Sequence, residues 1–214
     1  LYALESVARA ILATVIPLQA LKLLGDAQGV STAFFVGSTA ALFGALAVPW
    51  LVRRLSRRFV YSLGFIMLVG AAALLSRDDT EVVFGGMILR ALGAVAVSVC
   101  LSLYMMDFLA RRDLGRAEPM RLFYSAGAWC AGPFLGVLLA EKLHPLAPYA
   151  MSGAIALTAM GYFWFLRLTE NPAVVQKAIP VPSPLRYVRR YFSQTRLTLA
   201  WLLSTGRVIW WVIL

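Results

Sequence analysis

The chain has 214 residues, of which 61% are hydrophobic and 14% are charged, and its formal net charge is +10. Soluble domains are nearer to about 45–50% apolar and about 25% charged, so this composition excludes an ordinary soluble globular domain. In a soluble protein such a basic charge would suggest nucleic-acid binding, whereas in a membrane protein it indicates which loops face the cytoplasm. The distribution of the charge decides between these two interpretations.

Apolar runs of about 20 residues predict membrane-spanning helices. Because the runs are continuously apolar and rich in Ala, Leu and Gly, they do not fit the alternating strands of a membrane barrel. Six complete spans are predicted, in chain order Tyr2–Leu24, Ala27–Val52, Phe59–Ser76, Val82–Leu109, Leu122–Ala140 and Leu143–Leu166. A seventh begins near Leu197 and continues to Leu214. The predicted fold class is an all-α polytopic membrane protein, a six-helix transmembrane bundle plus the start of a seventh helix.

The chain divides into three predicted parts. Residues 1–168 form the six-helix bundle, residues 169–196 form a proline-containing cytoplasmic linker, and residues 197–214 start a second bundle. There is no initiator Met, and the chain stops inside the apolar run VIWWVIL. We therefore expect a fragment of a longer protein, whose remaining half follows.

Basic residues gather in alternate connections. Four lie within Arg53–Arg58, four within Arg111–Arg121 and six within Arg167–Arg196, whereas the opposite connections hold only Lys22, Arg77 and Lys142. Positively charged loops stay on the cytoplasmic side, so we expect both ends of the six-helix unit inside, in a bacterial inner membrane. The arginines are then explained by topology, and no nucleic-acid partner is expected.

Ionisable and polar residues inside a span are costly and usually face a cavity or one another. Glu5 and Arg9 are spaced i,i+4 and can pair on one helix face, either as a structural ion pair or as part of a polar path in which Glu5 carries a proton. Arg90 lies too deep in its span to reach the surface easily, which favours a cavity-facing role. Gln19, which follows Pro17 closely, is a candidate polar contact in the same cavity.

The fifth span contains the stretch GAWCAGPFLG, with Gly127, Gly132, Pro133 and Gly136. Proline removes a backbone hydrogen bond and can kink a helix, while glycines let helix backbones approach closely. The pattern predicts either a kinked packing helix or a face where two bundles contact and hinge.

The sequence offers little for enzyme chemistry. The only histidine, His144, lies in a loop or at a helix end, and no HExxH motif or carboxylate cluster for two metals occurs. Cys100 and Cys130 lie in apolar runs without a CxxC spacing, which is typical of packing residues. No glycine-rich phosphate loop followed by Lys is present. We therefore expect no enzyme activity, no metal and no cofactor.

In this arrangement the chain resembles the N-terminal half of the major facilitator superfamily of secondary transporters, over essentially its whole length. The shared features are six spans with both ends inside, a basic connection after the second, a long central cytoplasmic segment and the start of a seventh span. Three local motifs, in the second connection and in the fourth and fifth helices, support the resemblance.

The family's second connection reads roughly G-x-x-x-D-R-x-G-R-R. Arg57 and Arg58 match the last two positions, and Pro49, Arg53 and Ser56 stand where the family has Gly, Asp and Gly. The resemblance implies a conformational switch made of Arg54, Arg57, Arg58 and an acidic residue at the inner end of the fourth helix. Asp107 is placed for that acid, with Arg57 as its expected partner.

The family's fourth helix carries Arg followed by Gly four residues later; Arg90 fits, although position 94 is Ala and the glycine comes at 93. The fifth helix often reads G-x-x-x-G-P-x-x-G-G, most typically in antiporters. Gly132, Pro133 and Gly136 match, while Ala128 and Val137 replace the outer glycines and Gly127 stands one place early.

The resemblance implies two six-helix bundles with the substrate bound between them near the bilayer midplane. This chain would supply one wall, and Glu5, Arg9, Gln19 and Arg90 would line the substrate and proton pathway. The leading hypothesis is a secondary active transporter that moves a small organic solute by alternating access, coupled to protons. Export by antiport is favoured by the fifth-helix motif, and uptake by symport stays open.

Two alternatives remain at this point. A non-transporting sensor or assembly protein on the same scaffold would fit the degenerate second connection and the lack of an unpaired carboxylate in mid-membrane. A membrane-embedded transferase or hydrolase would need an acidic metal cluster or a histidine-based site, and these 214 residues contain neither.

Overall fold

The computed structural model describes residues 1–108 and 111–166, with side chains given for residues 1–106 and 119–166. Over these ranges the chain is entirely α-helical, which confirms the predicted fold class. The helices are α1 (Tyr2–Leu24), α2 (Ala27–Leu55), α3 (Arg57–Leu75), α4 (Thr80–Phe108), α5 (Arg111–Lys142) and α6 (Ala147–Phe165). The predicted linker over residues 169–196 and the seventh helix over residues 197–214 lie outside the described residues.

Five of the described helices, α1 to α5, are long and apolar enough to cross a membrane. The sixth, α6, has 19 residues and no charged side chain, but it is not among the five. Its proline, tyrosines, serine, threonine and glycines dilute the hydropathy of its apolar residues.

Two connections that hydropathy predicts as loops are largely helical. In the arginine cluster, Arg53 and Arg54 lie in the last turn of α2, and Arg57 and Arg58 begin α3. Only Ser56 lies between the two helices. The fifth helix begins at Arg111 rather than at Leu122, so most of the predicted loop belongs to α5. Charged residues such as Arg and Glu form helices well, and hydropathy identifies only the part of a helix that lies in lipid.

The first connection shows how the chain reverses direction within a few residues. Gly25 ends α1 in the left-handed conformation, with φ 75°, and its N–H donates to the Leu21 carbonyl. Asp26 then caps α2 by accepting a hydrogen bond from the backbone N–H of Gly29 at 3.2 Å. These two hydrogen bonds satisfy a carbonyl at the end of α1 and an N–H at the start of α2.

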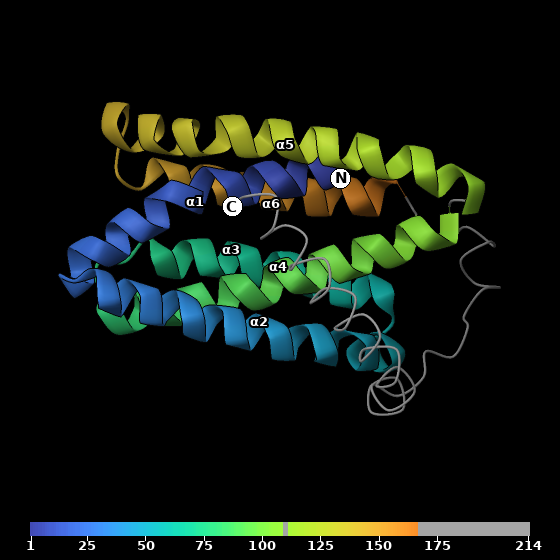
Figure 1. Ribbon diagram of the computed structural model, residues 1–214, viewed down its shortest axis with the longest axis horizontal. Coiled ribbons are helices and arrows are strands. Elements are labelled where there is room, and N and C mark those ends of the chain that lie inside the picture. Colours follow the sequence, from blue (N-terminus) through green and yellow to red (C-terminus); the bar gives the residue numbers. More distant parts are fainter. Residues whose placement is uncertain (109–110, 167–214) are drawn as a thin grey trace, which may run out of the picture. The chain divides into compact units, whose positions relative to one another are not determined.

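The six helices pack in a pattern that is symmetric under exchange of α1–α3 with α4–α6 (Figure 1). Under this exchange α1 corresponds to α4, α2 to α5 and α3 to α6. The α1–α5 contact then has its counterpart in the α4–α2 contact, and the α3–α4 contact in the α6–α1 contact. The corresponding helices α3 and α6 pack on each other. Figure 1 accordingly shows α1, α5 and α6 side by side, next to a second group of α2, α3 and α4. The two three-helix halves are therefore arranged as structural repeats.

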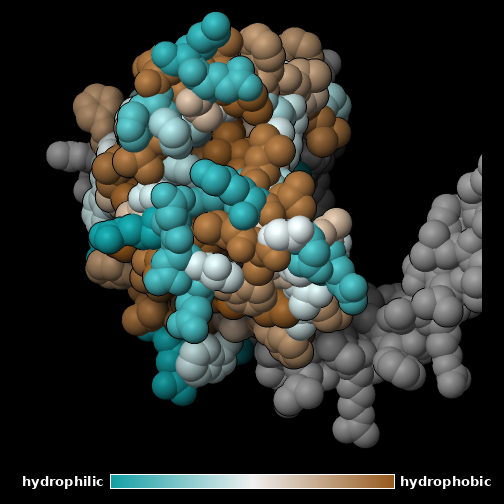
Figure 2. All heavy atoms as spheres, turned by 90° about the vertical axis from the view of Figure 1, so that its left-hand side faces the viewer, coloured by the Kyte–Doolittle hydropathy of each residue, from teal (hydrophilic) through white to brown (hydrophobic). Residues whose placement is uncertain are grey.

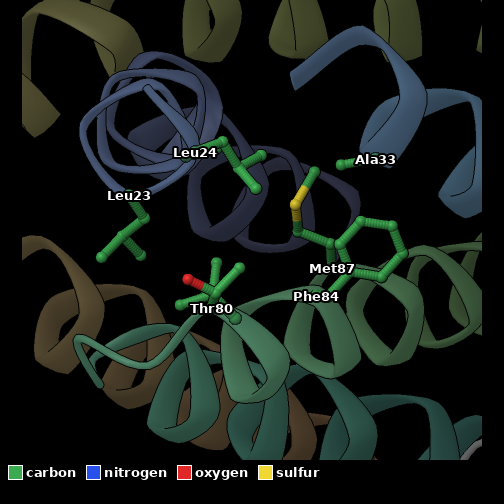
Figure 3. Close-up of a pocket in the computed structure, with 8 residues that line it drawn as sticks. Leu23, Leu24, Ala33, Thr80, Phe84 and Met87 are labelled. Atoms are coloured by element: carbon green, nitrogen blue, oxygen red, sulfur yellow. The ribbon is translucent and has the colours of Figure 1, made fainter. Parts of the chain in front are cut away.

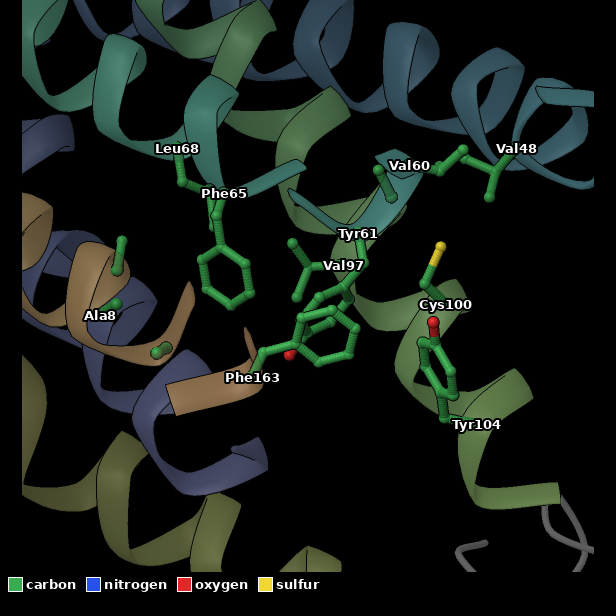
Figure 4. Close-up of a cluster of buried hydrophobic side chains, with 13 residues drawn as sticks. Ala8, Val48, Val60, Tyr61, Phe65, Leu68, Val97, Cys100, Tyr104 and Phe163 are labelled. Atoms are coloured by element: carbon green, nitrogen blue, oxygen red, sulfur yellow. The ribbon is translucent and has the colours of Figure 1, made fainter. Parts of the chain in front are cut away.

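Two buried clusters form the core, one toward each end of the bundle. The larger contains an aromatic group in which Tyr61 contacts Phe65, Tyr104 and Phe163, with ring centroids 5.0, 6.3 and 4.3 Å away (Figure 4). This aromatic group joins α3, α4 and α6. The smaller cluster joins α1 to α2, α3, α4 and α6 through Ile11, Leu12, Val15, Ile16, Ala33, Leu75, Val83, Met87 and Tyr149.

At the end of the bundle that carries the α1–α2, α3–α4 and α5–α6 connections, polar side chains lie among apolar ones on the surface (Figure 2). Exposed polar residues of these connections include Asp26, Arg77, Asp78, Asp79, Glu141 and Lys142. Large apolar side chains such as Phe35, Phe43 and Phe134 are 65–72% exposed on the sides of the helices. Polar ends and apolar sides are the surface expected of a bundle that stands in a bilayer.

The α1–α5 contact depends on two glycines of the fifth-helix pattern. A Cβ atom added to Gly132 would overlap Ala10, and one added to Gly136 would overlap the Ile11 carbonyl oxygen. Nothing lies within 4 Å of a Cβ added to Gly127. Gly132 and Gly136 therefore bring the two backbones into direct contact, whereas close packing does not require a glycine at position 127.

We predict that Gly136→Ala destabilises the bundle by about 1–3 kcal/mol, because the added methyl group meets a backbone carbonyl that cannot move independently of α1. Thermal unfolding of the purified protein in detergent measures the effect. Gly127→Ala on the same helix is the matched control and should leave the midpoint unchanged or slightly raised. Equal midpoints for the two variants would contradict the packing role.

Candidate functional site

A pocket of about 150 Å³ lies between α1, α2 and α4, and Arg90 is the charged residue in its wall. The other lining residues are Ile16, Phe34, Gly37, Ser38, Ala41, Met87 and Ala91. All but Ser38 are apolar. The pocket is therefore an apolar hollow with one guanidinium group and one hydroxyl group.

Arg90 lies deep in its helix. It follows Thr80, the first residue of α4, by ten residues, which is about 15 Å along the axis and roughly half of a 30 Å hydrocarbon core. Its Nη2 atom donates a hydrogen bond to the Arg9 carbonyl oxygen at 2.9 Å. This bond ties α4 to α1 across the wall of the pocket and orients the guanidinium group.

Arg9 also forms an ion pair within α1. Its Nε atom lies 3.2 Å from Oε1 of Glu5, whose side chain is 0% exposed, while that of Arg9 is 21% exposed. The contact lies outside hydrogen-bond geometry, and neither oxygen of Glu5 has a hydrogen-bond partner. Glu5 is thus a buried carboxylate held mainly by charge, as its i,i+4 spacing from Arg9 predicted.

Arg121 of α5 is a second cation at this end of α1. Its guanidinium group lies 5.0 Å from the centroid of the Tyr2 ring and donates from Nη1 to the Ser102 hydroxyl at 3.3 Å. Its charge also acts on Glu5. The sequence places Arg121 in a loop and does not predict that its charge acts on Glu5. Only the packing of α5 on α1 brings Arg121 close to Glu5.

Gln19 lies away from the Arg90 pocket and connects three elements. Its Oε1 atom accepts a hydrogen bond from the Tyr149 hydroxyl of α6, and its Nε2 atom donates to the Arg77 carbonyl in the α3–α4 turn at 3.0 Å. Both ends of the amide are therefore satisfied within the described part of the chain. The arrangement anchors the second half of α1 at the end of the bundle that is poor in basic residues.

A small apolar gap lies beside the pocket, nearer the same end of α1 (Figure 3). Its volume is about 10 Å³, which is room for about one water molecule. Leu24, Thr80 and Phe84 line it together with Met87, which also lines the Arg90 pocket. Met87 therefore stands between the two hollows.

The arginine junction contains one half-buried and three exposed guanidinium groups. Arg54 stacks on Trp50 at 4.8 Å and Arg58 on Phe59 at 4.9 Å, each on its own helix. Arg57 is half-buried, and its charge acts on Cys100 and Tyr104 of α4. The side chain of Asp107, its predicted partner, lies outside the described residues, so the Arg57–Asp107 contact stays a prediction.

Ser56 has an unusual backbone conformation, with φ 65° and ψ 152°. Among the described residues it is the only one other than glycine with positive φ. This region of φ and ψ is almost restricted to glycine, because a Cβ atom collides with the backbone there. In the pattern G-x-x-x-D-R-x-G-R-R the position of Ser56 is a glycine, and this backbone conformation gives the physical reason for that glycine.

Among the described residues, no three His, Cys, Asp or Glu side chains lie together in a way that could hold a metal ion. Cys100 is buried and Cys130 is exposed on α5, and both are free thiols.

Comparison with known families decides what kind of protein carries this arrangement. The family model of the Major Facilitator Superfamily matches residues 1–214. The chain belongs to the Major Facilitator Superfamily. No curated protein and no solved structure gave a match.

Membership in the Major Facilitator Superfamily implies an integral multi-pass membrane protein that carries out secondary transport of a small-molecule substrate across a lipid bilayer. Proteins of this family are transporters and not enzymes, so the transferase or hydrolase hypothesis is wrong. The symmetric contacts of α1–α3 and α4–α6 also fit the family, whose six-helix halves contain two three-helix repeats.

We predict that Ser56→Gly stabilises this Major Facilitator Superfamily chain by a net free energy on the order of 1 kcal/mol, since it removes backbone strain but adds chain entropy. Thermal unfolding in detergent should show a higher midpoint. Ser76→Gly is the control, because Ser76 ends α3 with φ −76° and its hydroxyl donates to the Ala73 carbonyl. That variant should unfold at the same or a lower temperature. A lower midpoint for Ser56→Gly would contradict the strain.

Proposed function

We propose that this protein is a proton-coupled secondary transporter that moves a small organic solute by alternating access, in the direction of export. The pocket around Arg90 carries the proposal, because it combines an apolar wall with a guanidinium group at mid-membrane depth. Charged groups at this depth are costly and are usually kept for substrate or ion pathways. The residues 1–168 form the six-helix bundle in this proposal, the residues 169–196 the cytoplasmic linker, and the residues 197–214 the start of the second bundle.

Glu5 is the proposed proton carrier. Its carboxylate is buried with Oε1 3.2 Å from the Arg9 Nε atom, so a change in this contact would change how readily Glu5 takes up a proton. Because Arg9 also accepts a hydrogen bond from Arg90 through its carbonyl oxygen, Arg9 links the ion pair to the charged residue of the pocket. A movement of α1 relative to α4 would therefore change both sites together, which is the linkage that coupled transport requires.

The packing of α5 on α1 supports the proposed direction of transport. Gly132 and Gly136, which belong to the pattern found in antiporters, lie directly on α1 next to Ala10 and Ile11. Pro133 lies between them and removes one backbone hydrogen bond from α5. A close contact beside a proline suits a helix that must shift against α1 during transport. Arg54, Arg57, Arg58 and Asp107 form the proposed conformational switch at the other end.

We predict that Glu5→Gln abolishes solute movement driven by a pH gradient but retains solute exchange without a gradient. Glutamine keeps the size of the side chain and cannot release a proton. Transport by the intact protein in proteoliposomes, with and without a pH gradient, measures the difference.

Glu141→Gln, at the exposed end of α5, is the matched control and should retain proton-driven flux. Unchanged proton-driven flux in Glu5→Gln would exclude coupling through Glu5. Loss of both activities with a normal unfolding midpoint would assign Glu5 to substrate movement itself rather than to coupling.

The proposed location is a bacterial inner membrane, with the basic junctions in the cytoplasm. We predict that a membrane-impermeant maleimide labels Asp79→Cys but not Leu55→Cys in intact cells, when Cys100 and Cys130 are replaced by Ala. Both positions are exposed, and they lie in connections at opposite ends of α3. Both should react after the membrane is permeabilised. Labelling of Leu55→Cys alone in intact cells would reverse the proposed orientation.

One observation favours a second candidate, a non-transporting sensor on the same scaffold. Glu5 is paired with Arg9, and the described parts of the spans contain no unpaired carboxylate at mid-membrane depth to carry protons. The absence of flux for every class of solute tested, with the intact and folded protein, would favour this candidate.

A further inference from the structure

We propose that the Arg90 pocket binds a small organic monoanion, whose carboxylate contacts Arg90 and Ser38 and whose apolar body lies against Ile16, Phe34 and Met87. This inference rests on the proposed transport function and names the class of its substrate. It depends on the donors that Arg90 has left, on the charge balance around it, and on the size and lining of the pocket.

Arg90 has donors to spare in the pocket. A guanidinium group has five N–H donors, and only Nη2 of Arg90 has an acceptor among the described residues, the Arg9 carbonyl. None of its nitrogen atoms is both buried and unpaired, so the remaining donors stay accessible, and Arg90 lines the hollow. The fork of a guanidinium group fits the two oxygens of a carboxylate, which can accept two parallel hydrogen bonds.

The positive charge of Arg90 has no carboxylate partner in the described part of the chain. Glu5 is paired with Arg9, and the acceptor that Arg90 has among the described residues is a neutral carbonyl. A charge in a low-dielectric site is stabilised by an opposite charge or is costly. An anionic ligand would supply the missing charge, whereas a cationic ligand would meet repulsion and a neutral one would leave the charge uncompensated.

The rest of the pocket determines the body of the ligand. With Arg90 as the single charged residue in the wall, the site balances one negative charge. Ser38 has no hydrogen-bond partner within the described residues, and its hydroxyl can donate to a carboxylate oxygen. The remaining surface is apolar. A volume of about 150 Å³ is that of a cavity known to hold benzene, so the ligand portion in this wall has the size of one aromatic ring or a short alkyl chain.

The test uses the intact purified protein and two pairs of probes, benzoate with benzamide and hexanoate with hexanamide. The members of each pair differ in charge but hardly in size. Isothermal titration calorimetry should show that each carboxylate binds at least about tenfold more tightly than its amide, since hydrogen bonds to charged groups contribute about 1.5–3 kcal/mol. Equal affinities within each pair, or no binding of either carboxylate at millimolar concentration, would overturn the proposal without any variant.

Substitutions then assign the charge to Arg90. Arg90→Gln should weaken carboxylate binding at least about tenfold and leave amide binding unchanged, while Arg90→Lys should retain part of the affinity. Arg77→Gln is the matched control, because Arg77 is exposed in the α3–α4 turn and contributes only its backbone carbonyl to Gln19. Full carboxylate affinity in Arg90→Gln would overturn the proposal.

Flux assays separate failure of this inference from failure of the proposed function. Proteoliposomes that transport a neutral or cationic solute, with equal rates in wild type and Arg90→Gln, would keep the transporter and overturn the anion site. Benzoate uptake that is lost in Arg90→Gln and kept in Arg77→Gln supports both. No flux for any solute class, with the carboxylates still bound more tightly than their amides, would refute the transport function and keep the anion site.

Discussion

The first helix is the element on which the other contacts depend, and two neighbouring carbonyl groups show why. The Ala8 carbonyl accepts a hydrogen bond from the Ser152 hydroxyl of α6 at 2.6 Å, and the Arg9 carbonyl accepts one from Arg90 of α4 at 2.9 Å. A lipid-embedded side chain must find its acceptors within the protein, because no water replaces them. The backbone of α1 supplies these acceptors and so fixes α4 and α6 relative to itself.

The same turn of α1 receives the closest helix contact on its other side. The residues after these two carbonyls, Ala10 and Ile11, meet Gly132 and Gly136 of α5. Within about one turn, α1 therefore contacts α4, α5 and α6 and carries Arg9 of the buried ion pair. Any tilt of α1 must break or exchange contacts with three helices together. This concentration of contacts makes a two-state rearrangement more plausible physically than a gradual bend, since packed interfaces do not deform continuously.

The structure also explains where local strain is located. Ser56 connects α2 to α3 in a backbone conformation that favours glycine, between two pairs of arginines at one end of the bundle. At the opposite end, Gln19 satisfies both of its polar groups by joining α1 to α6 and to the α3–α4 turn. One end is thus held by satisfied hydrogen bonds, and the other contains strain and like charges, so the second end is the one that is easier to rearrange.

The sequence by itself determined the helical fold, the spans of the first five helices and the Glu5–Arg9 pair, because lipid requires long apolar runs and helix periodicity places residues i and i+4 together. It also indicated that Arg90 faces a polar partner. Only the tertiary structure decided that this partner is the Arg9 carbonyl, that Gln19 binds Tyr149 rather than lining the pocket, and that Arg121 acts on Glu5. These contacts join residues far apart in the chain, and helix packing sets them through side-chain shape and glycine positions that no local pattern encodes.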